Sequence, residues 1–367
     1  MNLNNAQVAV AGAGVAGRLL ACRLLDAGAR VSLVDENPAS DARSCSFAAA
    51  GMLSPLAEIE QGELTIAEFG RRSLTLWPQW LAWWGFEHCF RQRGSLVLAH
   101  GADRVELERF SGQLRRRLGQ RADCLRTCAA AELEPDLAGF EHALFLPEEG
   151  QIDTHAVMAH LLEYFIDSGG QWRPATAVDE VEARQLSIAG ARENFDWVFD
   201  CRGLGARQSI PQLRGVRGEL LWLCAPEVDI SRPVRLMHPR YRIYLVPRSD
   251  GVYLLGATEI ESESMRSVSV RSALELLSAA YTLNSGFGEA EILDFVVQCR
   301  PTTRDHLPYL HTEPGLTRIN GLYRHGFLLA PAMVERALAN FANQPRDVTG
   351  NLDPTRIGAA ACPGLHQ

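Results

Sequence analysis

The chain has 367 residues, of which 47% are hydrophobic, and a formal net charge of −8 at pH 7. This length and apolar content suffice for two domains with buried cores, and no stretch reaches the roughly 18 uncharged apolar residues of a membrane span. The negative charge disfavours nucleic acid as a partner, because such binding rests on neutralising phosphates.

Every fixed cation is an arginine, because the sequence contains no lysine. The absence of lysine excludes a Walker A phosphate site, a pyridoxal Schiff base and a lysine nucleophile. The nine cysteines are scattered and form neither a disulfide framework nor a CxxC metal pattern. The N-terminus has no basic segment of the kind that begins a signal peptide, so we expect a cytoplasmic location.

The first 36 residues predict a β-α-β unit. "QVAVAG" and "ARVSLVDE" are apolar strands, and "AGVAGRLLACRLLDAG" between them has apolar residues at helical spacing. Gly12, Gly14 and Gly17 form GxGxxG in the first turn, and Asp35 ends the second strand. The pattern predicts a dinucleotide site, with the pyrophosphate at the helix N-terminus and ribose hydroxyls on Asp35 rather than on Glu36. The alternative is a tight βα turn in another Rossmann-like domain.

The next stretches contain two features with competing interpretations. "SCSFAAAGMLSP" is a run of small residues, which favours the close approach of a bulky planar group or tight helix packing. Trp77, Trp80 and Trp84 recur at helical spacing, which predicts core or interface packing rather than a membrane edge. "RVELERFSGQLRRRLGQR" is typical of a solvated helix face more than of an RNA site.

A second helix is predicted for "DTHAVMAHLLEYFIDSGG", with Asp153 or Thr154 as its N-cap. His155 and His160 are five residues apart and do not share a face, and no metal-ligand spacing is present, so we expect no metal. "FDWVFDCRGLGAR" then predicts a buried strand and a glycine turn that return to the dinucleotide domain.

The pattern changes to short strands from about residue 215. "GVRGELLWL", "RYRIYLVPR" and "GVYLLGAT" predict an inserted antiparallel sheet. A helix ("RSALELLSAAY"), an apolar strand ("ILDFVVQC") and the segment "RPTTRDHLPYL" follow. "GLYRHGFLLAP" then precedes the last helix, "PAMVERALANFAN", and residues 346–367 are expected to form a loosely held tail.

Seven of these motifs, in this order, resemble the D-amino-acid oxidase and glycine oxidase family of flavoproteins, most closely its branch in thiamine biosynthesis. They are "AGAGVAG" with Asp35, "SFAAAGML", "GQIDTHAV", "GVRGELL", "YLVPRSDGVYLLGAT", "RPTTRDHLPY" and "GLYRHGFLLAP". The resemblance spans roughly residues 7 to 342 and implies FAD rather than NAD.

The resemblance also implies the fold class, an α/β two-domain protein. A Rossmann-like FAD-binding domain would carry an inserted substrate domain built on an antiparallel sheet. The FAD-binding domain is expected over 1–80, 145–212 and 296–345, and the substrate domain over 81–144 and 213–295.

The resemblance implies that Tyr244, Arg300 and Arg324 hold the substrate carboxylate, which suits two guanidinium groups and a phenol. The alternatives are bonds from Arg324 to nearby carbonyls and an ion pair between Arg300 and Asp305. Further cavity positions are expected at Met52, Arg242, Glu259 and His325, with core packing as the alternative for Met52. The family usually has a histidine at Leu322 and an asparagine at His325. Arg242 and Glu259 could therefore narrow the pocket toward glycine or grip a polar side chain.

The cofactor-binding positions that the resemblance and the fingerprint imply are Gly12, Gly14, Val15, Gly17, Asp35, Glu36, Ser46, Ala49, Ala50, Gly51, Met52, Val178, Cys201, Gly203, Gly205, Arg300, Arg324, Gly326 and Leu328. The helix N-terminus behind Gly326 would stabilise negative charge on the reduced flavin ring. The sarcosine oxidase branch is disfavoured, because its oxygen-activating lysine cannot exist here. The local motif near Cys299 also differs from the one that attaches flavin in that branch, so we expect non-covalent FAD.

The expected reaction is oxidation of glycine or a small D- or N-alkyl amino acid by hydride transfer to FAD. It would give an imino acid, then an oxo acid and ammonia, with hydrogen peroxide from dioxygen, and with glycine it would supply thiazole synthesis. Three alternatives stay open: a dehydrogenase that reduces a quinone or a protein, an RNA-modifying flavoenzyme, and a non-catalytic flavoprotein subunit. The resemblance also implies a homo-oligomer.

Overall fold

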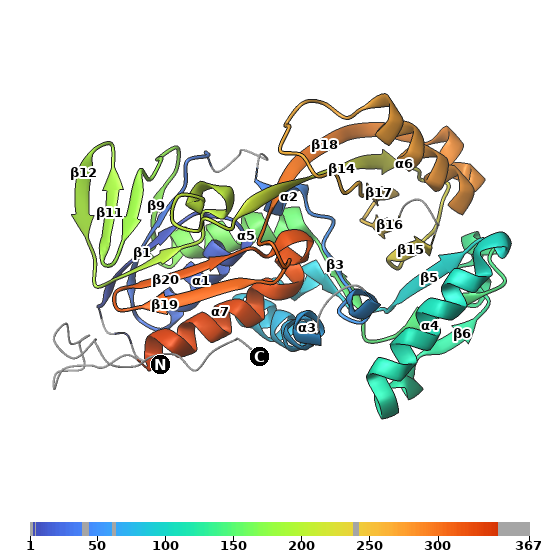
Figure 1. The fold of residues 1–367 in the computed structure, drawn as a ribbon, viewed down its shortest axis with the longest axis horizontal. Helices are drawn as coiled ribbons and strands as arrows, with labels where there is room; N and C mark the ends of the chain where they lie inside the picture. Colours follow the sequence, from blue (N-terminus) through green and yellow to red (C-terminus); the bar gives the residue numbers. More distant parts are fainter. Residues whose placement is uncertain (1–2, 4, 39–43, 61–63, 238–241, 344–367) are drawn as a thin grey trace.

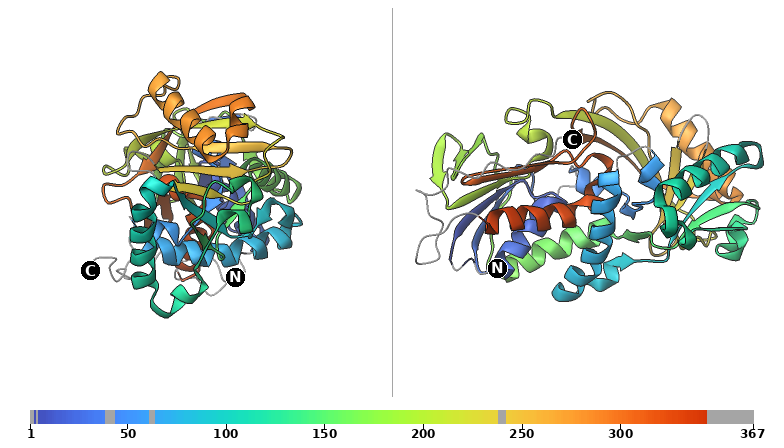
Figure 2. Two further views of the ribbon diagram at one scale, coloured as in Figure 1. Left: turned by 90° about the vertical axis from the view of Figure 1, so that its right-hand side faces the viewer. Right: turned by 60° about the horizontal axis from the view of Figure 1, so that its bottom comes forward.

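The computed structural model describes all residues except 1–2, 4, 39–43, 61–63, 238–241 and 344–367. The elongated molecule has a mainly parallel sheet with its helices at one end and a second, larger sheet at the other (Figures 1 and 2). The expected tail lies outside the described residues. Within them, no helix has both the length and the apolar character needed to cross a bilayer.

The first sheet has six strands in the order β19-β20-β13-β1-β2-β9, parallel except for the edge strand β19. Its strands are β1 (Gln7–Ala11), β2 (Arg30–Val34), β9 (Gln171–Arg173), β13 (Trp197–Asp200), β19 (Tyr309–Glu313) and β20 (Leu316–Asn320). The predicted β-α-β unit is confirmed, since β1 and β2 pair in parallel on either side of α1 (Val15–Asp26).

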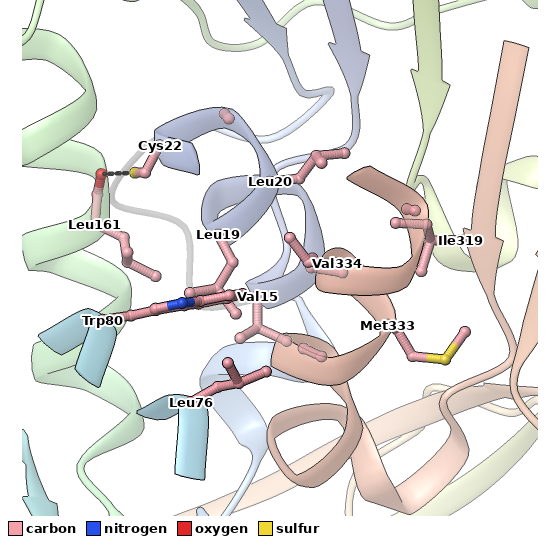
Figure 3. Close-up of a cluster of buried hydrophobic side chains, with 14 of the residues drawn as sticks. Val15, Leu19, Leu20, Cys22, Leu76, Trp80, Leu161, Ile319, Met333 and Val334 are labelled. Atoms are coloured by element: carbon pink, nitrogen blue, oxygen red, sulfur yellow. Dashed lines mark hydrogen bonds between the residues drawn. The ribbon is translucent and has the colours of Figure 1, made fainter. Parts of the chain in front are cut away.

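Alternating side chains of β1 face two different layers. Val8 and Val10 join the helical core, whereas Ala9 and Ala11 contact a small sheet of strands β10 (Glu180–Glu182), β11 (Gln185–Ile188) and β12 (Ala191–Asn194). The helical layer comprises α1, α3 (Leu64–Trp84), α5 (Thr154–Asp167) and α7 (Gly326–Ala342). Figure 3 shows α1 side chains packed among residues of the other three helices and of β20.

The tryptophan-rich stretch lies in α3, and its predicted role in core packing is confirmed for three residues. Trp77, Trp80 and Trp84 are buried, whereas Trp83 is 71% exposed. The indole N–H of Trp77 donates to the carbonyl of Phe327 over 2.9 Å, which fixes α3 to the first turn of α7. This contact matters for the cavity, because residues 324–328 line it.

The second sheet has eight strands in the order β18-β14-β17-β16-β15-β5-β7-β6. All neighbours are antiparallel except β5 and β15, so the prediction of an antiparallel insertion is correct but for one parallel pair. The strands are β5 (Ser95–Ala99), β6 (Arg126–Cys128), β7 (Ala143–Leu146), β14 (Arg214–Cys224), β15 (Val234–Met237), β16 (Arg242–Pro247), β17 (Val252–Gly256) and β18 (Glu291–Thr302).

Two helices pack on this sheet through alternate residues of its strands. Leu96 and Leu98 share a core with α6 (Val270–Leu283), whereas Val97 packs with the arginine-rich α4 (Arg104–Leu118). The strand predicted from "ILDFVVQC" exists as part of β18 but lies at the sheet edge, where Ile292 and Leu293 are exposed. Its apolar composition therefore does not reflect burial. The numerical domain boundaries stay predictions.

Short elements join the two sheets. They are α2 (Cys45–Ala48) and a sheet of β3 (Met52–Leu53), β8 (Gly150–Ile152) and β4 (Phe90–Arg91). The small-residue stretch therefore runs through α2 and β3, between the parallel sheet and the large sheet. Helix α5 begins at Thr154 with Asp153 as its N-cap, whose carboxylate accepts from the N–H of Ala156 over 3.0 Å. This resolves the choice between the two predicted caps.

Candidate active site

A cavity of about 990 Å³ lies between the carboxyl end of β1 and the large sheet. Its volume is at the upper end of the range typical of ligand pockets. The predicted positions that line it are Gly12, Gly14, Val15, Asp35, Glu36, Ser46, Ala49, Ala50, Gly51, Met52, Val178, Cys201, Gly203, Gly205, Tyr244, Glu259, Arg300, Arg324, His325, Gly326 and Leu328. Their roles in binding stay predictions.

The glycines of the first turn allow three close approaches. Gly12 has φ +96°, and a Cβ there would lie 2.6 Å from the carbonyl carbon of Cys201. A Cβ on Gly17 would overlap the carbonyl oxygen of Gly12, so Gly17 permits helix packing and does not itself line the cavity. A Cβ on Gly14 would meet just one side-chain atom, Ser46 Oγ, at 3.2 Å. The N-terminus of α1 is thus left open toward the cavity.

Asp35 lies at the end of β2, as predicted, and its carboxylate is already hydrogen-bonded. Oδ2 accepts from the N–H of Ala13 over 2.5 Å, and Oδ1 accepts from the N–H of Asn37 over 2.8 Å. These bonds hold the carboxylate beside the first turn. Oδ1 also accepts from the side-chain amide of Asn37 over 3.1 Å, so it is Oδ2 that has a second lone pair with which it could accept a ribose hydroxyl.

The small-residue stretch forms part of the cavity wall. Ser46 Oγ accepts from the N–H of Val15 over 2.9 Å, which joins α2 to the start of α1. The carbonyl of Ala50 accepts from the guanidinium of Arg248 over 2.7 Å. Gly51 has φ +72°, and a Cβ there would overlap the carbonyl oxygen of Ile152. The backbone of this stretch is therefore fixed on both sides.

Tyr244 on β16 and Arg300 on β18 each lie against a glycine of a neighbouring strand. A Cβ on Gly256, the pairing partner of Tyr244, would lie 2.7 Å from the phenol oxygen. A Cβ on Gly218 of β14 would overlap Arg300 Nη2 and Cζ. The two glycines thus provide the space in which the phenol and the guanidinium group lie.

Arg300 donates to the carbonyl of Thr258 over 3.1 Å. Among the residues that the structure describes, no carboxylate lies within ion-pair distance of it. The alternative pairing with Asp305 is not present, because that carboxylate accepts from Thr303 Oγ1 and from the N–H of Leu307. Arg300 is therefore a partly buried cation on the cavity wall without an ion-pair partner among the described residues.

Arg324 reaches the cavity from the turn before α7. That turn bends through Gly321 (φ +65°) and Tyr323 (φ +52°). The guanidinium forms ion pairs with Glu58 at 2.7 Å and Glu259 at 3.1 Å. Burial lowers the pKa of Arg324, but the two carboxylates outweigh it and the net shift is upward. The sequence did not predict these ion pairs with two carboxylates.

Glu58 is the functional candidate that sequence reasoning missed. It is 5% exposed, and its other oxygen pairs with Arg235 at 2.7 Å. Burial alone would raise the pKa of this carboxyl, but Arg324, Arg235 and His325 outweigh it and lower the pKa far below its usual range. Glu58 is therefore a carboxylate at any physiological pH. Its sequence signal was weak: one acid a few residues beyond Met52.

Two neighbours stay uncharged at neutral pH. Burial lowers the pKa of His325 to about 4, and Arg324 and Arg235 lower it against the opposing effect of Glu58 at 3.7 Å. Burial raises the pKa of Tyr244, although the nearby guanidinium groups partly offset the rise. His325 is thus a neutral imidazole, and Tyr244 is a protonated phenol that can donate to an anion.

The remaining predicted pocket residues differ in position. Met52 lines the cavity and also packs against Tyr244 and Trp222, so both interpretations of it hold. Glu259 lies at the rim, with its side chain 48% exposed. The backbone of Arg242 pairs with Met237 in the sheet, and its side chain lies outside the described structure.

A cluster that the sequence analysis did not foresee lies away from this cavity. Ligand atoms of His88, Cys89 and His160 lie within 4.8 Å of one another, and none of these residues lines the cavity. Burial and the charge of Asp153 raise the pKa of the Cys89 thiol to about 11, which disfavours the thiolate that a metal requires. The expectation that the protein has no metal stays a prediction.

The chain is similar to known oxidoreductases over most of its length. Residues 7–338 match the family of FAD dependent oxidoreductases named DAO. A Rhizobium etli protein named as the thiamine biosynthesis oxidoreductase ThiO is 40% identical over 345 residues, which are 92% of this chain and 98% of that protein.

Solved structures of oxidases have a similar fold over most of the chain. A crystal structure of glycine oxidase from Geobacillus kaustophilus has a TM-score of 0.77 at 25% identity and covers 96% of this chain and 99% of its own. Iminodiacetate oxidase from Chelativorans sp. BNC1 has a TM-score of 0.80 at 24% identity. The match covers 93% of this chain and 97% of the oxidase, and it indicates the fold alone. The chain belongs to the DAO family, and it is an FAD-dependent oxidoreductase.

Proposed function

We propose that this enzyme oxidises the amine of glycine or another small amino acid, with Tyr244 and Arg300 as the main contacts of the substrate carboxylate. The observation that carries the proposal is the guanidinium of Arg300, which has no ion-pair partner among the described residues, in a cavity that it shares with the protonated phenol of Tyr244. A planar carboxylate offers a matching charge and two acceptor atoms. Arg324 lines the same cavity, and its positive charge is offset by ion pairs with Glu58 and Glu259.

The residues at the other end of the cavity fit FAD. Gly12 and Gly14 leave the N-terminus of α1 open, which suits a pyrophosphate, and Asp35 lies where a ribose would be. Gly326 begins α7 at the cavity wall, so this helix N-terminus can stabilise negative charge beside it. When bound, FAD supplies the two-electron oxidation of the carbon that bears the substrate amine.

The residues of this chain contribute binding and orientation rather than proton transfer. Arg300 and Tyr244 fix the carboxylate and thereby place the neighbouring carbon. His325 is neutral but buried beside Glu58, and the buried Tyr244 keeps its proton. A substrate with a neutral amine needs no side-chain base, which agrees with these two protonation states.

Three finer points belong to the same proposal. A relative named glycine oxidase supports glycine as the substrate, and the relative named ThiO supports a role in thiamine biosynthesis. The imine formed from glycine would then enter thiazole synthesis. Non-covalent FAD is supported by the three described cysteines that line the cavity. Burial raises the pKa of Cys299, that of Cys45 to about 11 and that of Cys201 still further, so none is a ready nucleophile. Homo-oligomerisation is supported by the exposed apolar residues on the edge strand β18.

The test is to mix the purified yellow protein anaerobically with glycine, sarcosine, D-alanine and D-proline and then to readmit air. We expect rapid bleaching of the flavin absorbance by glycine, and hydrogen peroxide on reoxidation. Bleaching without reoxidation by air would indicate a dehydrogenase instead. A flavin that no amine bleaches would contradict the proposed function.

A further inference from the structure

Five charged side chains that the structure describes form one group at the substrate end of the cavity. Three are the guanidinium groups of Arg235, Arg300 and Arg324, and two are the carboxylates of Glu58 and Glu259. Glu58 bridges Arg235 and Arg324 at 2.7 Å each, and Glu259 pairs with Arg324 at 3.1 Å. The two carboxylates therefore balance two of the three cations, and Arg300 remains.

Arg235 has capacity that the described structure does not use. It comes from β15, and its ion pair with Glu58 uses one of its terminal nitrogens. Its Nε–H is buried and has no hydrogen-bond partner among the described residues. A guanidinium group offers five N–H donors and can bind a carboxylate through two of them. Without Glu58, Arg235 and Arg324 would together form a second site for a carboxylate.

A second buried acidic residue, Glu149, holds the backbone just before Glu58. Glu149 accepts from the backbone N–H groups of Leu56 and Ala57 over 3.1 and 3.0 Å, and it also accepts from the hydroxyl of Ser95. Glu149 is fully buried. The backbone just before Glu58 is thus fixed to β5 of the large sheet, so a substrate can displace the Glu58 carboxylate only by rotating its side chain and breaking both ion pairs.

We infer that Glu58 determines specificity by occupying Arg235 and Arg324, so that the cavity accepts amino acids with one carboxylate and rejects those with two. This inference rests on the proposed function only in taking the cavity as the substrate site. A second substrate carboxylate would meet the carboxylate of Glu58 in a buried setting, where like charges repel strongly. A monocarboxylate needs only the site that Arg300 and Tyr244 provide.

The test measures binding to the FAD-bound enzyme by isothermal titration calorimetry, with acetate as the monocarboxylate and malonate and succinate as dicarboxylates. None of the three has an amine, so the result does not depend on whether glycine is a substrate. The wild type should prefer acetate. In Glu58→Gln the affinity for a dicarboxylate relative to acetate should rise by about 10-fold or more, since one charge-assisted hydrogen bond is gained.

Two further variants isolate the mechanism. Glu58→Gln/Arg235→Gln restores the original charge balance, so the gain should disappear. Glu106→Gln, an exposed residue of α4, is the matched control and should leave the ratio unchanged. An unchanged ratio in Glu58→Gln, or a gain that persists in the double variant, would overturn the inference.

A third variant covers the case in which Glu58→Gln does not fold. Arg235→Gln leaves Glu58 with Arg324 alone and removes the net positive charge, so acetate should bind about 10-fold more weakly although Arg235 does not contact it. Unchanged acetate binding in this variant would overturn the charge balance. Absence of glycine oxidation with the expected binding ratios would contradict the proposed function and leave the inference standing.

Discussion

The glycine beneath Arg300 allows the carboxylate site to be tested without altering any polar group. In Gly218→Ala the new Cβ would overlap Nη2 and Cζ of Arg300 and lie 2.8 Å from Nη1. The overlapped atoms are the far end of a flexible side chain, so the guanidinium group should move while the backbone of β14 stays. The move breaks the bond to Thr258 and withdraws Arg300 from a bound carboxylate.

The magnitudes follow from these contacts. Losing one charge-assisted hydrogen bond to the substrate costs about 1.5–3 kcal/mol, which lowers kcat/KM for glycine by about 10- to 150-fold. Stability should change by less than about 1 kcal/mol, because the lost bond to Thr258 is offset by the removal of a flexible glycine from a strand.

The assay compares kcat/KM for glycine and urea unfolding in four proteins: wild type, Gly218→Ala, Arg300→Gln and the double variant. The double variant should match Arg300→Gln, since both changes act on one group. Gly112→Ala is the control, because its Cβ would meet nothing closer than 3.5 Å. Full activity in Gly218→Ala, or additive losses in the double variant, would refute the placement of Arg300.

Three other predictions follow from the described contacts. Gly17→Ala should abolish FAD retention and lower Tm, because its Cβ would overlap a backbone carbonyl; the absorbance at the flavin band and a thermal melt would show it. Glu149→Ala should reduce the free energy of unfolding in urea by about 2–5 kcal/mol, since it strands buried backbone donors, whereas Glu149→Gln should cost less. His325 is neutral when folded, with a pKa of about 4, and unfolded imidazole titrates near 6.5, so its stabilisation is present above about pH 6.5 and lost as pH falls toward 4. Unfolding free energies measured across that window should fall by up to about 1.4 kcal/mol per pH unit, and the fall should be smaller in His325→Asn.

Local signals made the positions of the glycine turn and of Asp35 at the cavity predictable. Gly12, Gly17 and Asp35 act within one turn between two adjacent strands, so their spacing in sequence reflects their spacing in space. Tyr244 lies on a strand that the sequence also predicted, whereas Arg300 lies where β18 continues beyond the predicted strand. Their convergence depends on glycines of other strands. The resemblance to a known family, rather than periodicity, brought them together in advance.

The charge balance at the substrate end was beyond sequence reasoning. Glu58 pairs with residues 177 and 266 positions away, and no spacing rule links such partners. The strand in β18 was predicted correctly, but its exposure was not predictable for a related reason. An apolar run indicates a strand, whereas its place at the sheet edge is decided by the pairing of all the other strands.

Arg235, Arg300 and Arg324, on the cavity wall near Tyr244, have a consequence for how the enzyme responds to alkaline solution. Arginine stays protonated beyond pH 12, and the pKa of Tyr244 is raised by burial, so this end of the cavity loses no proton on moderate alkalisation. The groups that do titrate there belong to the amino acid that enters. The pH at which turnover rises should therefore differ between substrates and follow the basicity of each amine. The charges of these protein groups would stay constant over that pH range.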